Sequence, residues 1–156
     1  MSTYLILKLV HVLSAAILFG TGLGTAFFMY RAAQSGNPFT AHATANSVVM
    51  ADWIFTTPAV VMQPITGLLL MQELGYGFDS IWFFSVVVLY AVAGGCWIPV
   101  VYIQYRLRNL AANHEASGYL PANFYRLTRT WTILGVIAFS AVLVLFFLMI
   151  FRPGLA

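Results

Sequence analysis

Four long apolar segments follow one another along this chain, and they constrain its fold more than any other feature. A helix crosses the bilayer with roughly 20 apolar residues, and segments 4–30, 46–73, 80–107 and 128–151 each reach that length. Hydrophobic residues make up 62% of the chain and charged residues 7%, whereas a soluble domain carries about 25% charged residues. The sequence therefore predicts an integral membrane protein.

Helices are the expected form of these segments, because lipid offers no partner for an unpaired backbone group. A chain of 156 residues has the length of one domain. We expect residues 1–156 to form a single all-α domain, a four-helix transmembrane bundle. The first segment is longer than the apolar part of a signal peptide, so it is expected to stay as a span.

Basic residues indicate the orientation of the bundle. Four spans place both termini and loop 72–79 on one side, together with Lys8 and Arg152. The other side carries Arg31, Arg106, Arg108, Arg126 and Arg129. Because arginine-rich loops stay in the cytoplasm, both termini are expected outside a bacterial inner membrane. Trp82 and Trp131 begin spans and are expected in the aromatic belts. The net charge of +3 requires no nucleic-acid partner.

The first segment contains a lysine and a histidine. At about 100° per residue, Lys8, His11 and Gly22 lie on one helical stripe. A histidine at this depth is hydrogen-bonded, bound to haem iron or a metal, or engaged in proton transfer. Lys8 either extends to the membrane surface or anchors an acidic group such as a haem propionate, together with Arg152. The small Gly22 would leave room for something flat.

Polar and small side chains recur at intervals of three and four along the second segment. The stripe consists of Asp52, Thr56, Ala59, Gln63 and Thr66. Asp52 is the one acid clearly within a span, so this side is expected to face the bundle interior. Asp52 either makes a packing hydrogen bond or serves as a proton site. Pro58 and Pro64 each remove a backbone donor and are expected to bend the helix.

Two further patterns indicate helix contacts. Gly20 and Gly24 form a pair opposite the histidine stripe, with the spacing that suits close approach of another helix. This pair favours a homodimer or a second membrane subunit as partner. Tyr90, Gly94 and Trp97 share one side of the third segment, so aromatic surface is expected to face inward or toward a partner.

Four stretches of the chain, in order, resemble one known family. They are "LKLVHVLSAAILFGTGLGTAFFMYRA", "ADWIFTTPAVVMQPITGLLL", "GGCWIPVVYIQYRLR" and "LMIFRP". The family comprises predicted four-helix integral membrane proteins of bacteria, known as domain of unknown function 2269. The resemblance covers nearly the whole chain and implies the same membrane bundle.

More distantly, the first segment is similar to the start of the HemJ-type membrane protoporphyrinogen oxidases. In those small helical bundles, a histidine that follows a basic residue in helix one binds haem b. The resemblance implies that His11 is an axial ligand. Further matching positions are Lys8, Arg31, Pro58 or Pro64, Gly67 and the Arg152–Pro153 end. The third segment lacks that family's lysine, so the similarity favours haem binding over porphyrinogen oxidation.

A weaker similarity, through "HVL" in the first segment, is to copper-resistance membrane proteins of the CopD type. Copper would need more sulfur or imidazole ligands than His11 alone, and Met62, Met71 and Met149 are the nearest additions that the spans offer.

Together these patterns predict a haem b-binding membrane protein that transfers electrons. Its cofactor contacts would be His11 at the iron with Lys8, Gly22 and Arg152 around it, and Asp52, Thr56 and Gln63 would form a polar track. A quinone is one exchange partner to consider. As an enzyme it would be a haem-dependent membrane oxidoreductase, with no catalytic residue indicated. The alternatives are a non-enzymatic subunit or assembly partner, a copper-handling protein, and a small transporter or ion pathway that uses Asp52.

Overall fold

Four long helical segments make up the part of the chain that the structure describes. The structure is a computed structural model that describes residues 2–152. The helices are α1 (Thr3–Gln34), α2 (Pro38–Ala51), α3 (Thr57–Leu74), α4 (Ile81–Asn113) and α5 (Ala122–Phe151), with a π-helical turn η1 (Asp52–Thr56) joining α2 to α3 and a short turn η2 (Glu115–Ser117). The described residues contain no strand, and four of their helical segments are long and apolar enough to cross a membrane. The predicted all-α membrane bundle is confirmed.

The helices continue past the predicted spans toward the arginine-rich end. The first span was expected over 4–30, but α1 runs to Gln34. Hydropathy marks the part of a helix that lies in lipid, whereas the helix itself continues until a residue stops it. Here the turn is set by Asn37, whose Oδ1 accepts hydrogen bonds from the N–H groups of Phe39 and Thr40 at 2.9 and 3.3 Å. This is an N-cap that starts α2.

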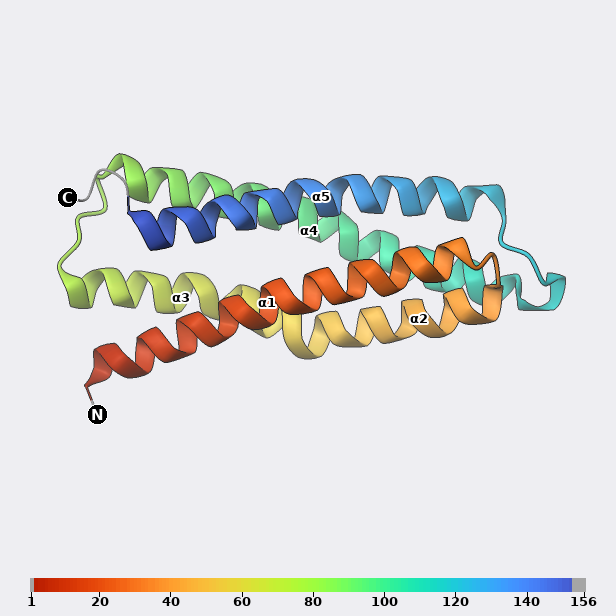
Figure 1. Cartoon of the computed structure of the whole chain (residues 1–156), viewed down its shortest axis with the longest axis horizontal. Coiled ribbons are helices and arrows are strands. Elements are labelled where there is room, and N and C mark those ends of the chain that lie inside the picture. The colour runs from red at the N-terminus through yellow and green to blue at the C-terminus, as the bar shows by residue number, and fades with distance from the viewer. Residues whose placement is uncertain (1, 153–156) are drawn as a thin grey trace.

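The helices alternate in direction (Figure 1). The start of α1, the end of α5 and the α3–α4 loop lie at one end of the bundle, on the left of the view, and the α1–α2 and α4–α5 connections lie at the other. We name these the terminal half and the arginine half, after the five arginines Arg31, Arg106, Arg108, Arg126 and Arg129. α4 packs along α5, α1 packs on α3 and α2, and α2 packs on α4.

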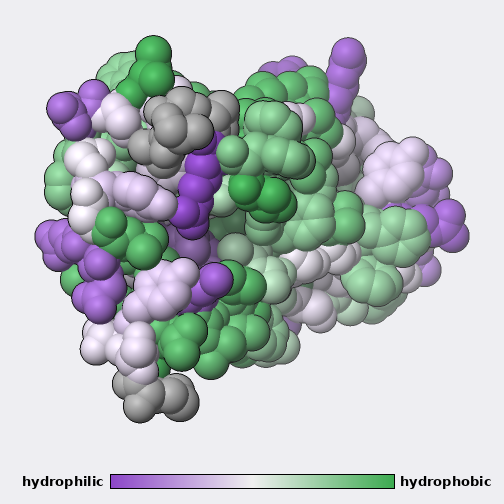
Figure 2. Space-filling view, turned by 60° about the vertical axis from the view of Figure 1, so that its left-hand side comes forward, coloured by the Kyte–Doolittle hydropathy of each residue, from purple (hydrophilic) through white to green (hydrophobic). Residues whose placement is uncertain are grey.

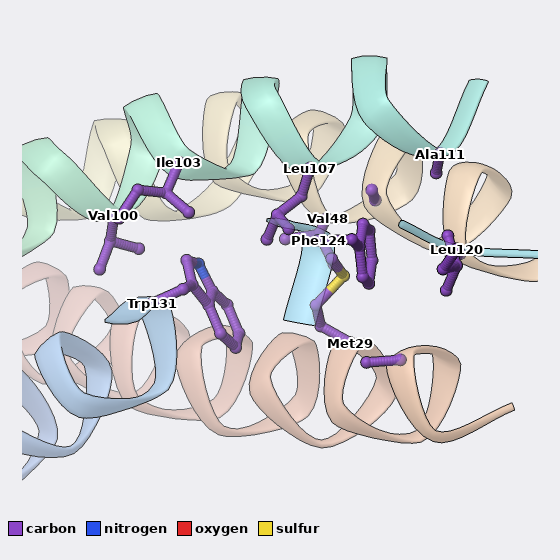
Figure 3. Packing of buried hydrophobic residues seen from close by; sticks show 12 residues of the cluster. Met29, Val48, Val100, Ile103, Leu107, Ala111, Leu120, Phe124 and Trp131 are labelled. Atoms are coloured by element: carbon purple, nitrogen blue, oxygen red, sulfur yellow. The ribbon is translucent and has the colours of Figure 1, made fainter. Parts of the chain in front are cut away.

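The enclosed apolar core lies in the arginine half (Figure 3). Met29 of α1, Leu107 of α4 and Phe124 of α5 meet there, each with 0% of its surface exposed. Trp131 joins this cluster at 5% exposure, and Trp82 is also buried and donates from Nε1 to a backbone oxygen of α5. The expectation that both tryptophans lie in lipid-facing belts is wrong. Distance from a span's end gives height in the membrane but not the side of the helix.

The outer flank of the bundle is apolar. Figure 2 shows hydrophobic residues over most of its middle, with hydrophilic residues gathered toward the two ends. Ile81, Ile98 and Ile150 are 80%, 68% and 71% exposed. Such surface is unfavourable in water, whereas lipid tails are as apolar as the side chains themselves. The flank therefore suits a protein embedded in a bilayer.

The turn η1 interrupts the second span directly before Pro58. Within it the N–H of Thr57 bonds to the carbonyl oxygen of Asp52, five residues back rather than four. Pro58 has no N–H, and its ring crowds the carbonyl four residues earlier, so the wider turn accommodates a position that a regular α-helix does not. The sequence predicted a bend here. The π turn takes that place and leaves Asp52 and Thr56 buried.

Candidate functional site

His11 connects α1 to α3 in the terminal half. Its Nδ1 lies 2.8 Å from Oγ1 of Thr66. The Thr66 hydroxyl donates its single hydrogen to the carbonyl oxygen of Met62 at 2.6 Å, a common arrangement for threonine within a helix. Thr66 therefore accepts from His11, and Nδ1 carries the ring hydrogen. In a neutral imidazole Nε2 then holds a free lone pair, and no residue in 2–152 donates a hydrogen bond to it.

Two more residues of α3 hold His11 in place. Gln63 donates from Nε2 to the backbone oxygen of His11 at 2.9 Å, which ties the two helices together at this level. Gly67 lies against the ring: a Cβ at Gly67 would stand 3.4 Å from Cε1 of His11. The similarity to the HemJ-type oxidases matched Gly67 without giving a structural reason for a glycine there. The close approach of the imidazole gives that reason.

The cationic residues predicted to surround a cofactor lie at the same end of the bundle as His11. Lys8 is exposed one turn closer to that end, with its Nζ 5.6 Å from the centroid of the Tyr4 ring. Arg152 donates to the hydroxyl of Tyr76 at 2.7 Å. Both cations therefore remain at the terminal surface, where an acidic group could reach them.

Gly22, which was expected beside the cofactor, does not lie near His11. It shares the inner side of α1 with His11 but lies about three helical turns away, roughly 16 Å at 1.5 Å per residue. A Cβ at Gly22 would meet nothing within 4 Å, so the position leaves space near the middle of the bundle rather than beside the ring. Pro153, named by the sequence comparison, lies outside the described residues.

Asp52 belongs to a second buried cluster near the middle of the bundle. Its Oδ1 accepts a hydrogen bond from the hydroxyl of Thr56 at 2.7 Å, and the side-chain amide of Gln104 on α4 lies beside the carboxylate. Asp52 and Gln104 are 5% and 3% exposed. Within residues 2–152, Oε1 of Gln104 has no hydrogen-bond partner. The acid faces the protein interior, as expected of an ionisable residue within a span.

The predicted polar stripe faces inward but divides into two groups. Gln63 and Thr66 contact His11, while Asp52 and Thr56 bond to each other, with Gln104 of α4 beside the Asp52 carboxylate. Ala59, which is buried between the groups, has no polar atoms in its side chain. Among the described residues no hydrogen bond links one group to the other, so the structure contains two polar clusters rather than one track.

Gln104 is the site residue that the sequence patterns did not single out. It lies seven positions after Trp97, on the side of α4 where Tyr90, Gly94 and Trp97 recur at helical spacing. Continuing that spacing would have reached Gln104. Its position between tyrosines and just before arginines is typical of a membrane boundary, so the sequence did not predict that Gln104 is buried.

In residues 2–152 no three His, Cys, Asp or Glu side chains lie close enough together to hold a bare metal ion. His42 is bonded to the carboxylate of Glu115 at 2.6 Å, and Nδ1 of His114 to a backbone oxygen. Copper bound by several soft ligands gains no support from this arrangement. Haem iron differs, since the protein supplies only its axial ligands.

Apolar flanks, four spanning helices and polar clusters confined to the interior define a four-span integral membrane protein. The chain belongs to the family described as "Predicted integral membrane protein (DUF2269)", whose model matches residues 5–153. No curated protein and no solved structure matches the chain. The match confirms the resemblance to domain of unknown function 2269 and places the protein in contact with the lipid bilayer. It assigns no reaction.

Proposed function

We propose that this membrane protein binds haem b, with Nε2 of His11 as an axial ligand of the iron. The supporting observation is the ring itself: Nδ1 donates to Thr66, and Nε2 has no hydrogen-bond donor among residues 2–152. Histidines that bind metals donate their other ring N–H to a neighbouring acceptor, which fixes the tautomer and the ring orientation. Thr66 is placed to do this for His11.

The surroundings of His11 fit a flat macrocycle. Leu7 and Ala15, its neighbours on the inner stripe, remain partly exposed, and the enclosed apolar cluster is confined to the other half of the bundle. A porphyrin in the terminal half would pack against this apolar surface through van der Waals contacts, which drive association inside a bilayer. The small Ala15 and Gly67 keep bulk away from the ring.

Each residue of the site has a distinct role in this proposal. His11 binds, Thr66 holds the Nδ1 hydrogen, and Gln63 keeps α1 in register with α3. Lys8 and Arg152 supply positive charge at the terminal surface, where acidic propionates would be stabilised. Bound haem supplies a one-electron carrier, so we propose electron transfer within the membrane as the activity.

The arginines suggest the sidedness of the site. Five of them lie in the arginine half, and basic residues flanking spans favour the cytoplasm. We therefore propose that both termini, Lys8 and Arg152 face the outside of a bacterial plasma membrane. His11 would lie about two to three turns below that outer surface, counting from the start of α1.

The visible absorption spectrum tests the proposal directly. Protein purified in mild detergent from haem-replete cells is expected to show a Soret band, and His11→Ala is expected to lose it. His42→Ala is the matched control, because His42 pairs with Glu115 in the arginine half and should keep the band. A colourless wild-type preparation, or an unchanged spectrum in His11→Ala, would refute haem ligation by this residue.

A second candidate is a subunit or assembly partner of a membrane complex. The observation in its favour is the open Gly20–Gly24 side of α1: a Cβ at either glycine would meet nothing within 4 Å. Small residues at this spacing let two helices approach closely. Gly20→Leu is expected to weaken association, measured as the oligomer fraction after crosslinking in membranes, while His11→Ala leaves it unchanged.

A further inference from the structure

The Asp52 cluster opens into a pocket that the haem proposal does not use. The pocket lies between the second span and α4 and has a volume of about 150 Å³. Six of its residues matter here: Asp52, Trp53 and Thr57 on one side, and Trp97, Val101 and Gln104 on the other. A cavity of this volume holds a single six-membered ring such as benzene, and it is far too small for a porphyrin.

The pocket is reached from the lipid rather than from water. Trp53 and Ile98 both line it, and they are 59% and 68% exposed on the apolar flank. The Trp53 ring is held in place by a 2.6 Å hydrogen bond from its Nε1 to the hydroxyl of Tyr105. An occupant that enters by this route must be soluble in lipid, which disfavours a free metal ion or a small charged molecule.

Two polar atoms of residues that line the pocket have no partner in the described part of the chain, although Asp52 accepts a hydrogen bond from Thr56. Within residues 2–152 the salt bridge present is His42–Glu115, so Asp52 has no cation beside it. Oε1 of Gln104 and Nε1 of Trp97 are both without hydrogen bonds. Buried polar atoms without partners are rare, because each costs about 1–3 kcal/mol. The arrangement calls for a ligand that carries oxygen atoms.

Carboxyl and amide groups suit one class of ring in particular. A carboxyl group accepts when ionised and donates when protonated, and a side-chain amide does both. Such a pair can bind a ring oxygen whether it is a carbonyl or a hydroxyl. The indoles of Trp53 and Trp97 offer flat apolar surface, which favours aromatic contacts.

We propose that this pocket binds the head group of a lipid-soluble quinone in either oxidation state. One ring oxygen lies at Asp52 and Gln104, the ring lies against Trp53 and Trp97, and the isoprenoid tail stays in the bilayer. The site is separate from His11 and does not need haem. A colourless preparation that still bound quinone would refute the haem proposal and leave this one intact.

Photolabelling of the full chain in lipid nanodiscs tests the proposal. The probe is an azido-benzoquinone with a short isoprenoid tail, and labelled peptides are mapped by mass spectrometry. Label is expected in segments 49–57 and 97–104, and excess unlabelled short-chain quinone, present during irradiation, should prevent it. Label spread evenly along the apolar flank, or labelling that the competitor does not prevent, would overturn the proposal.

Two variants make the test specific. Val101→Phe fills the pocket without changing a polar group, and Gln104→Leu removes the amide at similar size. Each is expected to reduce the labelling that excess quinone prevents by at least tenfold. Val88→Phe, on the lipid-facing side of α4, should leave this labelling unchanged. Equal labelling in Val101→Phe and in wild type would overturn the proposal even if Gln104→Leu did not fold.

Discussion

The imidazole of His11 and the hydroxyl of Thr66, 55 positions apart in the chain, are joined by a 2.8 Å hydrogen bond across the α1–α3 contact. The hydrogen of Thr66 is already committed to its own helix, so the bond runs from the ring to the hydroxyl. The direction of that bond decides which ring nitrogen is left for chemistry.

Thr66→Val removes the acceptor of the ring hydrogen at almost the same side-chain size. The ring would lose its fixed tautomer, and partners of this kind are worth 10–100-fold in metal affinity. Haem retention, measured by titration and the Soret band, is expected to fall by about that factor. Thr25→Val is the control, because that hydroxyl bonds only to carbonyls of its own helix. Equal haem retention in both variants would contradict the role given to Thr66.

A branched side chain at Gly67 is expected to displace the imidazole. The Cβ of alanine would stand 3.4 Å from Cε1 of His11, at the lower limit of ordinary contact, whereas the two methyl groups of Gly67→Val would extend past that contact. We expect Gly67→Val to lower haem content and Gly67→Ala to have the smaller effect. Gly94→Ala on α4 meets nothing within 4 Å and should leave haem content unaltered. Full haem content in Gly67→Val would show that the ring does not need this contact.

The two polar clusters show what a sequence pattern can predict and what it cannot. Helical periodicity alone predicted that Asp52, Thr56 and Thr66 face the interior, and they are buried. Periodicity places residues on a side of a helix but does not say which neighbour passes that side at each height. α1 lies along α3, and α4 lies along α2, with Gln104 of α4 beside Asp52. The one stripe therefore meets two different partners. The partner Gln104 therefore became visible only in the fold.

The same limit explains the tryptophans. Trp131 begins a span, and this suggested a position at the lipid interface. Its ring instead fills the space between α1 and α4 beside Phe124 in the enclosed core. The overall class, by contrast, followed from length and hydropathy, because the bilayer imposes those two properties on any spanning helix.

Coupling between Asp52 and Gln104 is expected in unfolding measurements. Asp52→Leu alone leaves the Gln104 amide buried without its neighbour, and Gln104→Leu alone does the same to the carboxylate. Leaving one partner unsatisfied costs more than replacing both with apolar groups. The double variant should therefore be more stable than the sum of the single effects, by roughly 0.5–3 kcal/mol. Denaturant unfolding in detergent gives the three values, and strictly additive effects would contradict the pairing.

Truncating the core is expected to destabilise the protein far more than truncating the flank. Phe124 is 0% exposed and Phe84 is 68% exposed. Phe124→Ala would leave a cavity and cost about 3–5 kcal/mol, whereas Phe84→Ala exchanges one lipid contact for another. Denaturant unfolding in detergent again provides the measurement. Similar losses in the two variants would show that the enclosed cluster of the arginine half does not stabilise the bundle.

Single cysteines can establish the sidedness of the membrane domain. The one native cysteine, Cys96, is free and partly buried, so Cys96→Ala provides the background. Asp79→Cys in the α3–α4 loop and Ser117→Cys in η2 lie at opposite ends of the bundle, and both positions are exposed. We propose that the five arginines keep the second end in the cytoplasm. A membrane-impermeant maleimide should then label Asp79→Cys in intact cells and Ser117→Cys only after permeabilisation. The reverse pattern would place Lys8 and Arg152 inside. The proposed haem site would then open toward the cytoplasm, and its electron partner would have to be sought there.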